Sequence, residues 1–189
     1  MGSCGESSDA PAGSEAGAGT SAAPISQLFP DDFKGVCSGA TVSAASAYDP
    51  AAKTHKALYF RTYEDDFTDQ SSSLPADWTV LFSPERDALS AIDLVVCARR
   101  TAERQVKLCD GFKIDGKETQ NKVRWHTATY AVSVREATTG KELAQTTLEA
   151  TDSDCPMFMS FDGDSDTVDG YASLSDSAVT DFLKPHIAP

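Results

Sequence analysis

VRWHTATYAVSVRE, residues 123–136, is the stretch that decides the fold, because it is the longest strand-like alternation in the chain. Tyr130, Val132 and Val134 recur at every second position and therefore share one face of a sheet. The turn ATTG follows at residues 137–140, where the glycine supplies the positive φ that a short hairpin needs. Residues 141–150 are then expected to return as the antiparallel partner strand.

Three further segments are expected to extend this sheet. Residues 92–99 form a nearly continuous apolar run, which indicates a buried central strand. Residues 104–109 are expected to fold back on that strand as a hairpin, and the aromatic-rich run at residues 56–63 is typical of another strand. Residues 155–161, CPMFMSF, are expected to form a further strand or a covered edge.

A helix is expected near the C-terminus, over residues 175–184. Ser175 can cap its first turn, Val179 and Leu183 fall on one face, and Pro185 is expected to end it. The expected fold class is therefore mainly β (α+β), an antiparallel sheet or sandwich with a C-terminal helix and two disulfides.

The N-terminal segment is expected to lie outside the folded unit. From Cys4 to Pro24 there is no large apolar side chain, so the segment cannot repay the entropy of being ordered. We expect a disordered tether over residues 1–24 and a single disulfide-stapled β-rich domain over residues 25–189. No apolar run is long enough to span a bilayer, and no hydrophobic signal core precedes Cys4.

The cysteine count indicates an oxidising compartment. Setting Cys4 aside leaves an even number, Cys37, Cys97, Cys109 and Cys155, as expected for two disulfides. Because Cys97 and Cys109 flank the expected hairpin, they are predicted to pair, which leaves Cys37 for Cys155. A zinc cage is disfavoured because no two cysteines have the close spacing of zinc ligands. A catalytic thiol is disfavoured because the folded part has no cysteine left over.

The surroundings of Cys4 carry a resemblance. It follows the small residues Gly2 and Ser3 and precedes a spacer rich in Gly, Ala and Ser. This resembles the start of a mature bacterial lipoprotein, in which the cysteine carries the lipid after the export signal has been removed. The resemblance implies an extracytoplasmic protein anchored to the bacterial cell membrane through a lipid on Cys4. N-myristoylation is disfavoured because Glu6 stands where that motif has Ser or Thr. The alternative is a cysteine without function in a disordered tail.

A second resemblance covers roughly the second half of the chain. LVVC at residues 94–97, a second cysteine at 109, TTGK at residues 138–141 and the pair Cys155-Pro156 are similar to domains of unknown function in exported bacterial proteins. The shared positions are structural ones. The resemblance therefore implies export and a β-rich fold, and it carries no catalytic residue onto this chain.

The charge of the chain limits its partners. Its formal net charge is -13, and a field of that sign repels phosphate backbones, which excludes nucleic acid as an expected partner. The charge is uneven, because residues 99–124 hold eight of the 16 Lys and Arg, whereas residues 152–181 hold eight Asp and neither Lys nor Arg. Such a distribution indicates either a dipolar surface that steers a partner or two differently solvated faces.

Signatures of common enzymes are missing from the sequence. It contains no G-x-S-x-G elbow, no P-loop and no G-x-G-x-x-G fingerprint. His55, His126 and His186 are far apart in the sequence, so a hydrolase would need a site assembled from distant segments. A structural or surface role is therefore expected for each histidine.

Two groups of residues are candidates for binding. Carboxylates alternate in an acidic run at Asp162, Asp164 and Asp166, and the run departs from the EF-hand pattern. It either binds Ca²⁺ or forms a solvated loop. Aromatic side chains either line a ligand cleft or belong to the core. The aromatic candidates are Trp78, Trp125, Tyr59 and Tyr63.

These observations favour a non-catalytic, envelope-anchored module that binds an unknown protein or small-molecule ligand. The alternatives are an extracytoplasmic hydrolase with a dispersed site and a Ca²⁺-stabilised surface domain. A clustered Ser/His/Asp pocket favours the enzyme, whereas an apolar or aromatic patch without one favours binding.

Overall fold

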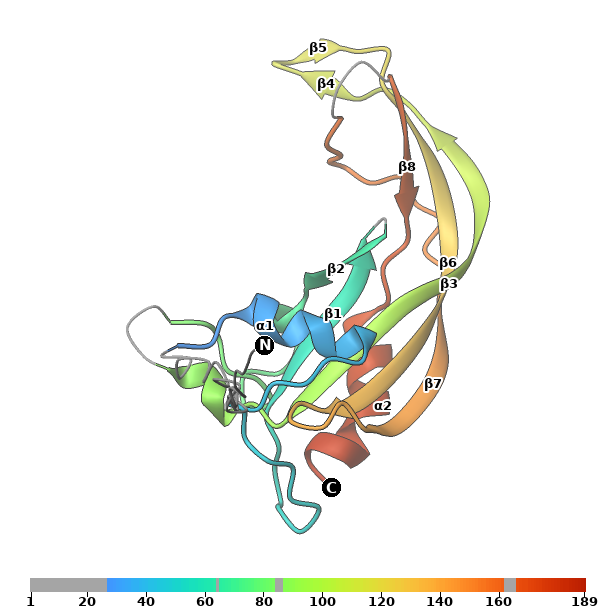
Figure 1. Cartoon of the computed structure of the whole chain (residues 1–189). Helices are drawn as coiled ribbons and strands as arrows, with labels where there is room; N and C mark the ends of the chain where they lie inside the picture. Colours follow the sequence, from blue (N-terminus) through green and yellow to red (C-terminus); the bar gives the residue numbers. More distant parts are fainter. Residues whose placement is uncertain (1–26, 64, 84–86, 162–165) are drawn as a thin grey trace, which may run out of the picture.

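The computed structural model describes residues 27–63, 65–83, 87–161 and 166–189. One mixed sheet has the strand order β2-β1-β3-β6-β7, with β8 paired to the first part of β6, and a C-terminal helix packs on it (Figure 1). This confirms the expected fold class, mainly β with a terminal helix and two disulfides. The elements are α1 (Pro30–Lys34), η1 (Gly35–Ser38), β1 (Ala57–Tyr63), β2 (Asp66–Asp69), η2 (Ser71–Ser73), η3 (Ala88–Ala91), β3 (Leu94–Cys109), β4 (Lys113–Ile114), β5 (Lys117–Glu118), β6 (Lys122–Glu136), β7 (Glu142–Ala150), β8 (Thr167–Tyr171) and α2 (Asp176–Ile187).

A long hairpin of β3 and β6 dominates the shape of the domain. Its antiparallel pairing runs from Leu94 opposite Glu136 to Cys109 opposite Val123. Two β-bulges interrupt the register, and bulges bend and twist the strands that carry them. The hairpin therefore arches away from the rest of the domain, with β4 and β5 at its tip (Figure 1). The expectation of two strands joined by a turn within residues 92–109 is wrong, because β3 passes through the bulges as one strand.

The β6–β7 hairpin is confirmed where it was expected. Gly140 has a φ of 69°, and its N–H donates to the carbonyl of Glu136 at 2.9 Å. The pairing then extends from Arg135 opposite Glu142 to Ala128 opposite Ala150. Local turn chemistry fixes this part of the fold.

Two of the strand pairs are parallel, so the sheet is mixed. β1 pairs with the first part of β3, and β8 pairs with the first part of β6. Residues 64–93 and 137–166 connect these pairs, and parallel neighbours need a crossover of about a dozen residues or more.

The base of the sheet is covered on both faces. Tyr59 and Val96 lie in one core, which α2 closes with Leu183 and other apolar side chains. Phe60 and Val95, whose side chains point the other way, lie in a second core beneath α1 and η1. A strand buried on both faces is expected to read as a continuous apolar run, as residues 94–98 do.

The disulfides join different cysteines from those predicted. Cys37 pairs with Cys97 at a Cα–Cα distance of 5.5 Å, and Cys109 pairs with Cys155 at 5.7 Å. The predicted pairing of Cys97 with Cys109 is wrong because both lie on β3. Twelve residues of extended strand cover about 40 Å, and a disulfide requires Cα atoms about 6 Å apart.

The C-terminal helix begins as predicted and ends later. The Ser175 hydroxyl accepts a hydrogen bond from the N–H of Ala178 at 3.2 Å, which confirms the cap. Pro185 lies inside α2, so the prediction that it ends the helix is wrong. The last turn is held by Ile187, whose side chain is buried and whose carbonyl accepts from the N–H of His55 at 2.9 Å.

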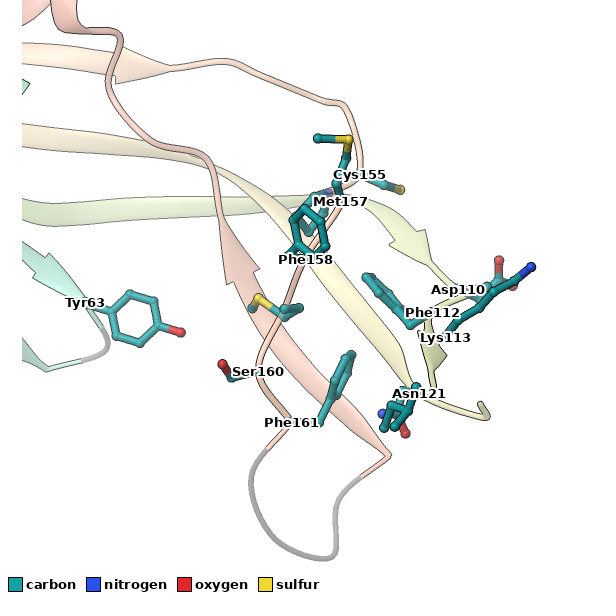
Figure 2. A pocket seen from close by; sticks show the side chains of 14 residues that line it. Tyr63, Asp110, Phe112, Lys113, Asn121, Cys155, Met157, Phe158, Ser160 and Phe161 are labelled. Carbon is teal, nitrogen blue, oxygen red and sulfur yellow. The ribbon is translucent and has the colours of Figure 1, made fainter. Parts of the chain in front are cut away.

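The segment at residues 155–161 forms no strand, which corrects the first expectation for it. It crosses the concave side of the arch as an irregular chain (Figures 1 and 2). The expectation of a covered edge is also wrong, because Met157 and Phe158 are exposed.

Candidate functional site

A groove of about 770 Å³ opens at the tip of the arch. We call it the tip groove. One side is the segment at residues 155–161, a second is the turn at the end of β3, and Tyr63 at the end of β1 faces it from the base (Figure 2). Its large apolar side chains are Phe112, Ile114, Met157, Phe158, Met159 and Phe161.

Several of the apolar side chains that line the tip groove are exposed, while the others pack partly buried against the core. Met157 is 86% exposed, Phe158 is 87% exposed and Tyr63 is 51% exposed. Single exposed apolar residues are ordinary, but several that line one concavity mark an interaction site. The groove also contains polar groups, including Lys113, Asn121 and Ser160.

The wall formed by residues 155–161 is anchored to the hairpin. The disulfide between Cys109 and Cys155 fixes its start to the end of β3. Just before it, the carbonyl of Asp152 accepts a hydrogen bond from Nε1 of Trp125 at 3.0 Å. The ring of Phe161 packs edge-on against Phe112, with centroids 5.2 Å apart. The exposed apolar side chains are therefore presented by a wall that is attached at both of its described ends.

A second, polar cavity of about 490 Å³ continues from the tip groove, because Tyr63, Met159 and Ser160 line both. We call it the polar cavity. Asp169 of β8 accepts two hydrogen bonds from Arg124 at 2.7 Å each and lies 3.0 Å from Nε2 of His126. The Arg124 hydrogen bonds lower the pKa of Asp169 to about 2, against a smaller opposing effect of partial burial, and His126 adds to the lowering.

Arg100 of β3 reaches into the same cavity. Its guanidinium lies 3.4 Å from the ring centroid of Tyr171 and pairs with Glu103 at 3.1 Å. Burial raises the pKa of the Tyr171 hydroxyl, so the ring stays neutral beneath the cation at neutral pH. Charged side chains of β3, β6 and β8 are thus paired with one another at and beside the polar cavity.

The histidines do not form a nucleophile relay among the described residues. His126 directs Nε2 to Asp169, and its other ring nitrogen, Nδ1, is buried without a hydrogen-bond partner. In a serine protease type of site, that second ring nitrogen accepts a hydrogen bond from the serine hydroxyl. His55 places Nδ1 2.5 Å from Asp93 and packs its ring on Tyr48. Neither pair continues to a serine hydroxyl or a thiol in the part of the chain described here.

The four aromatic candidates from the sequence have different environments. Tyr59 and Trp125 are buried, and burial raises the pKa of Tyr59 to about 12. Trp78 is partly buried against the same core. Tyr63 alone of the four lines the tip groove.

The sequence interpretation missed Met157, Phe158, Arg124 and Asp169. The run CPMFMSF was noted, but an apolar run predicts burial, and only the structure shows these side chains exposed. Arg124 and Asp169 come together across the parallel β6–β8 pair, for which the sequence carried no signal that we identified.

Three other candidates involve residues outside the described part of the chain, namely Cys4, Asp162 and Asp164. Asp166 is described, and its carbonyl accepts from the N–H of Lys122 at 2.7 Å. Within the described residues there is no group of three or more His, Cys, Asp or Glu placed to hold a metal ion. Calcium binding by this run stays a prediction.

Comparison with known proteins found no matching family model, no matching curated protein and no matching solved structure. Of the helices in the described residues, none has the length and apolar character needed to cross a bilayer. The functional conclusion therefore depends on the geometry of the two cavities and on the sequence.

Proposed function

We propose that this chain is the mature part of a bacterial cell-envelope lipoprotein, extracytoplasmic and anchored to the membrane by a lipid on Cys4. Its folded domain acts as a non-catalytic binding module, and the tip groove is the ligand site. Two observations support the location. Cys4 precedes a polar spacer, and the four remaining cysteines form two disulfides, as is usual outside the cytoplasm.

The exposure of Met157 and Phe158 in a groove of about 770 Å³ carries the binding proposal. Ligand sites are concave, have volumes of about 300–1,000 Å³, and combine apolar walls with a few polar groups. The tip groove matches this description, with Lys113 and Asn121 among its polar groups. Methionine adds a flexible, polarizable surface that adapts to the shape of a ligand.

The ionisable groups of the neighbouring polar cavity support binding over catalysis. The carboxylate of Asp169 is engaged by Arg124 and His126, and its lowered pKa keeps it ionised at neutral pH. A general acid or base needs a pKa closer to the working pH. The network therefore serves to hold β8 on β6 and to set the charge of the surface.

Titration with the apolar, anionic dye anilinonaphthalene sulfonate tests the proposal. The folded protein is expected to bind the dye saturably, and Phe158→Ser combined with Met157→Ser is expected to weaken binding about tenfold or more. The two substitutions remove apolar contacts with the dye. Because both side chains are exposed, the substitutions are expected to change the stability of the fold little. Leu108→Ser is the matched control, because Leu108 is 51% exposed on the same hairpin but does not line the groove.

Unchanged thermal midpoints in both variants show that the fold is intact. Equal dye affinity in the wild type and the groove variant, or the absence of saturable binding to the wild type, refutes the groove as a ligand site.

A further inference from the structure

Among the described strands β8 pairs with β6 alone, so no described strand lies along its other edge, and the hydrogen bonds between β8 and β6 show which backbone groups of Asp169 and Tyr171 lie there. The N–H of Lys122 donates to the carbonyl of Asp166, and the N–H of Ala172 donates to the carbonyl of His126. In a parallel pair, every second residue of a strand directs both its N–H and its C=O to the same neighbouring strand. The even-numbered residues of β8 therefore direct these backbone groups to β6. Asp169 and Tyr171 therefore direct their N–H and C=O groups away from β6. No backbone group among the described residues bonds to these four.

This edge lies beside both cavities. The side chains of Asp169 and Tyr171 line the polar cavity, together with Tyr63 from β1 and Ser160 from the segment at residues 155–161. Figure 1 shows β8 on the concave side of the arch, between β6 and the end of β1. A chain running along the edge of β8 therefore passes directly into the tip groove.

The edge of β3 is protected against the addition of another strand, whereas the edge of β8 is not. Beyond Ala98, β3 has no neighbour other than β6 among the described strands, but this stretch has two bulges and charged side chains at Glu103, Arg104 and Lys107. Bulges and charges are the usual devices that prevent strand addition. β8 pairs with β6 without a bulge, and its one charged side chain, Asp169, is engaged by Arg124.

The charge around the site selects the kind of partner. Residues 99–124, which form the arm of the hairpin, hold eight cations and four carboxylates, a net charge of +4 in a chain whose net charge is -13. Lys113 and Asp110 both belong to this arm and line the tip groove, so the excess of cations lies along the arm beyond the groove itself. Opposite charges favour association and fix its orientation, so an acidic partner is attracted to the arm and a basic one is repelled.

We propose that the site binds an extended, acidic polypeptide segment of another protein, which adds as a strand to the free edge of β8. A large apolar side chain of that segment enters the tip groove against Phe158 and Met157, and its acidic residues face the cationic arm. Strand addition of this kind obtains affinity from main-chain hydrogen bonds and specificity from pockets for alternate side chains. The inference rests on the proposed binding function and names the partner class.

Synthetic peptides test the strand-addition inference. A length of about seven residues is enough to span the edge of β8 and the tip groove. The set has a central Phe or Ser, flanked by Asp, by Lys or by Ser. Peptides with Phe and flanking Asp are expected to bind best, and raising the salt concentration is expected to weaken them. The same peptide with alternate backbone N-methyl groups keeps its side chains but loses its donors, and it is expected to bind about tenfold more weakly.

Amide hydrogen exchange locates the contact. The N–H groups of Asp169 and Tyr171 are expected to exchange more slowly when the peptide is bound, whereas Phe158→Ser is expected to abolish the preference for a central Phe. Binding that is indifferent to N-methylation, or that leaves both amides unprotected, overturns strand addition.

The outcomes separate this inference from the proposed function. If the protein binds the dye at the tip groove but no acidic peptide more tightly than its basic or neutral counterpart, the strand-addition inference fails and the groove function stands. If the dye does not bind either, both fail. Binding of anionic phosphatidylglycerol vesicles through Phe158, without peptide binding, would identify a membrane surface as the occupant and overturn the polypeptide partner.

Discussion

The two disulfides offer a matched pair of perturbations for the tip groove. Cys109 and Cys155 are replaced by Ala in one variant, and Cys37 and Cys97 in the other. The bridged residues are 46 positions apart in the first case and 60 in the second. The chain-entropy model gives about 4 kcal/mol for either loop, because the contribution depends only on the logarithm of loop length. Both variants are therefore expected to lose similar stability, equivalent to about 10 °C in thermal midpoint.

Their effects on the groove are expected to differ. Only the bridge from Cys109 to Cys155 fixes the wall that presents Met157 and Phe158. The bridge from Cys37 to Cys97 lies in the second core, away from the groove. Without the first bridge the residues next to Cys155 must be ordered at each binding event, at about 1 kcal/mol or more per residue, so one or two of them account for a tenfold loss of affinity. Affinity for the dye is expected to fall about tenfold or more in that variant and to change little in the other.

Urea unfolding measures the stability of each variant, and dye titration is then performed at a temperature where both are folded. If both variants bind the dye as the wild type does, the anchored wall is irrelevant to the groove. If the variant lacking the bridge from Cys37 to Cys97 loses binding equally, the effect belongs to general destabilisation and the reasoning is refuted.

Three further predictions follow from single residues. Asp169→Asn is expected to lower the thermal midpoint at pH 6. The difference from the wild type should shrink as the pH falls from about 4 to about 2, because a carboxylate with a lowered pKa stabilises the fold only while it is ionised. A difference in midpoint that does not depend on pH contradicts this. Gly170→Ala is expected to destabilise by about 1–3 kcal/mol in urea unfolding, because the added Cβ meets Val123 at 2.7 Å and Trp125 at 2.8 Å; an unchanged midpoint would show that β8 has room to move. Cys4→Ser is expected to shift the exported protein from the membrane fraction to the soluble fraction, and an unmodified Cys4 in the intact mass of native protein would remove the lipid anchor.

The parts of the fold that depend on neighbouring residues were predictable. The turn at Gly140 and the cap at Ser175 are set by local chemistry, and both were found as expected. The expected hairpin within residues 92–109 is wrong because β3 continues through two bulges, and the same error gave the wrong disulfide pairing of Cys97 with Cys109. The parallel pairs were missed because alternation within a strand does not reveal the direction of its neighbour.

The candidate site was less predictable, for a physical reason. Apolar residues in a sequence predict burial, and the rule is right for Tyr59 and Trp125. It is wrong for Met157 and Phe158, which are exposed although other side chains of the same segment, Met159 and Phe161, pack against the core. Exposure of this kind depends on where a distant disulfide and two bulges place a segment, and no local pattern encodes it.

The size of the exposed apolar surface also limits what the tip groove can do alone. A ligand that fully covers Met157 and Phe158 gains about 4 kcal/mol from these two side chains. Association costs at least about as much in lost translation and rotation, so these two side chains alone leave a net binding free energy near zero, which corresponds to dissociation constants far weaker than a millimolar. A polypeptide that also bonds to the four backbone groups of Asp169 and Tyr171 on β8 adds about 0.5–1.5 kcal/mol for each hydrogen bond, or about 2–6 kcal/mol together, which strengthens binding about thirtyfold or more. The affinity of the best acidic peptide therefore separates the two modes of binding. A dissociation constant of about a millimolar or tighter requires the edge of β8, whereas a constant much weaker than a millimolar is explained by the groove alone.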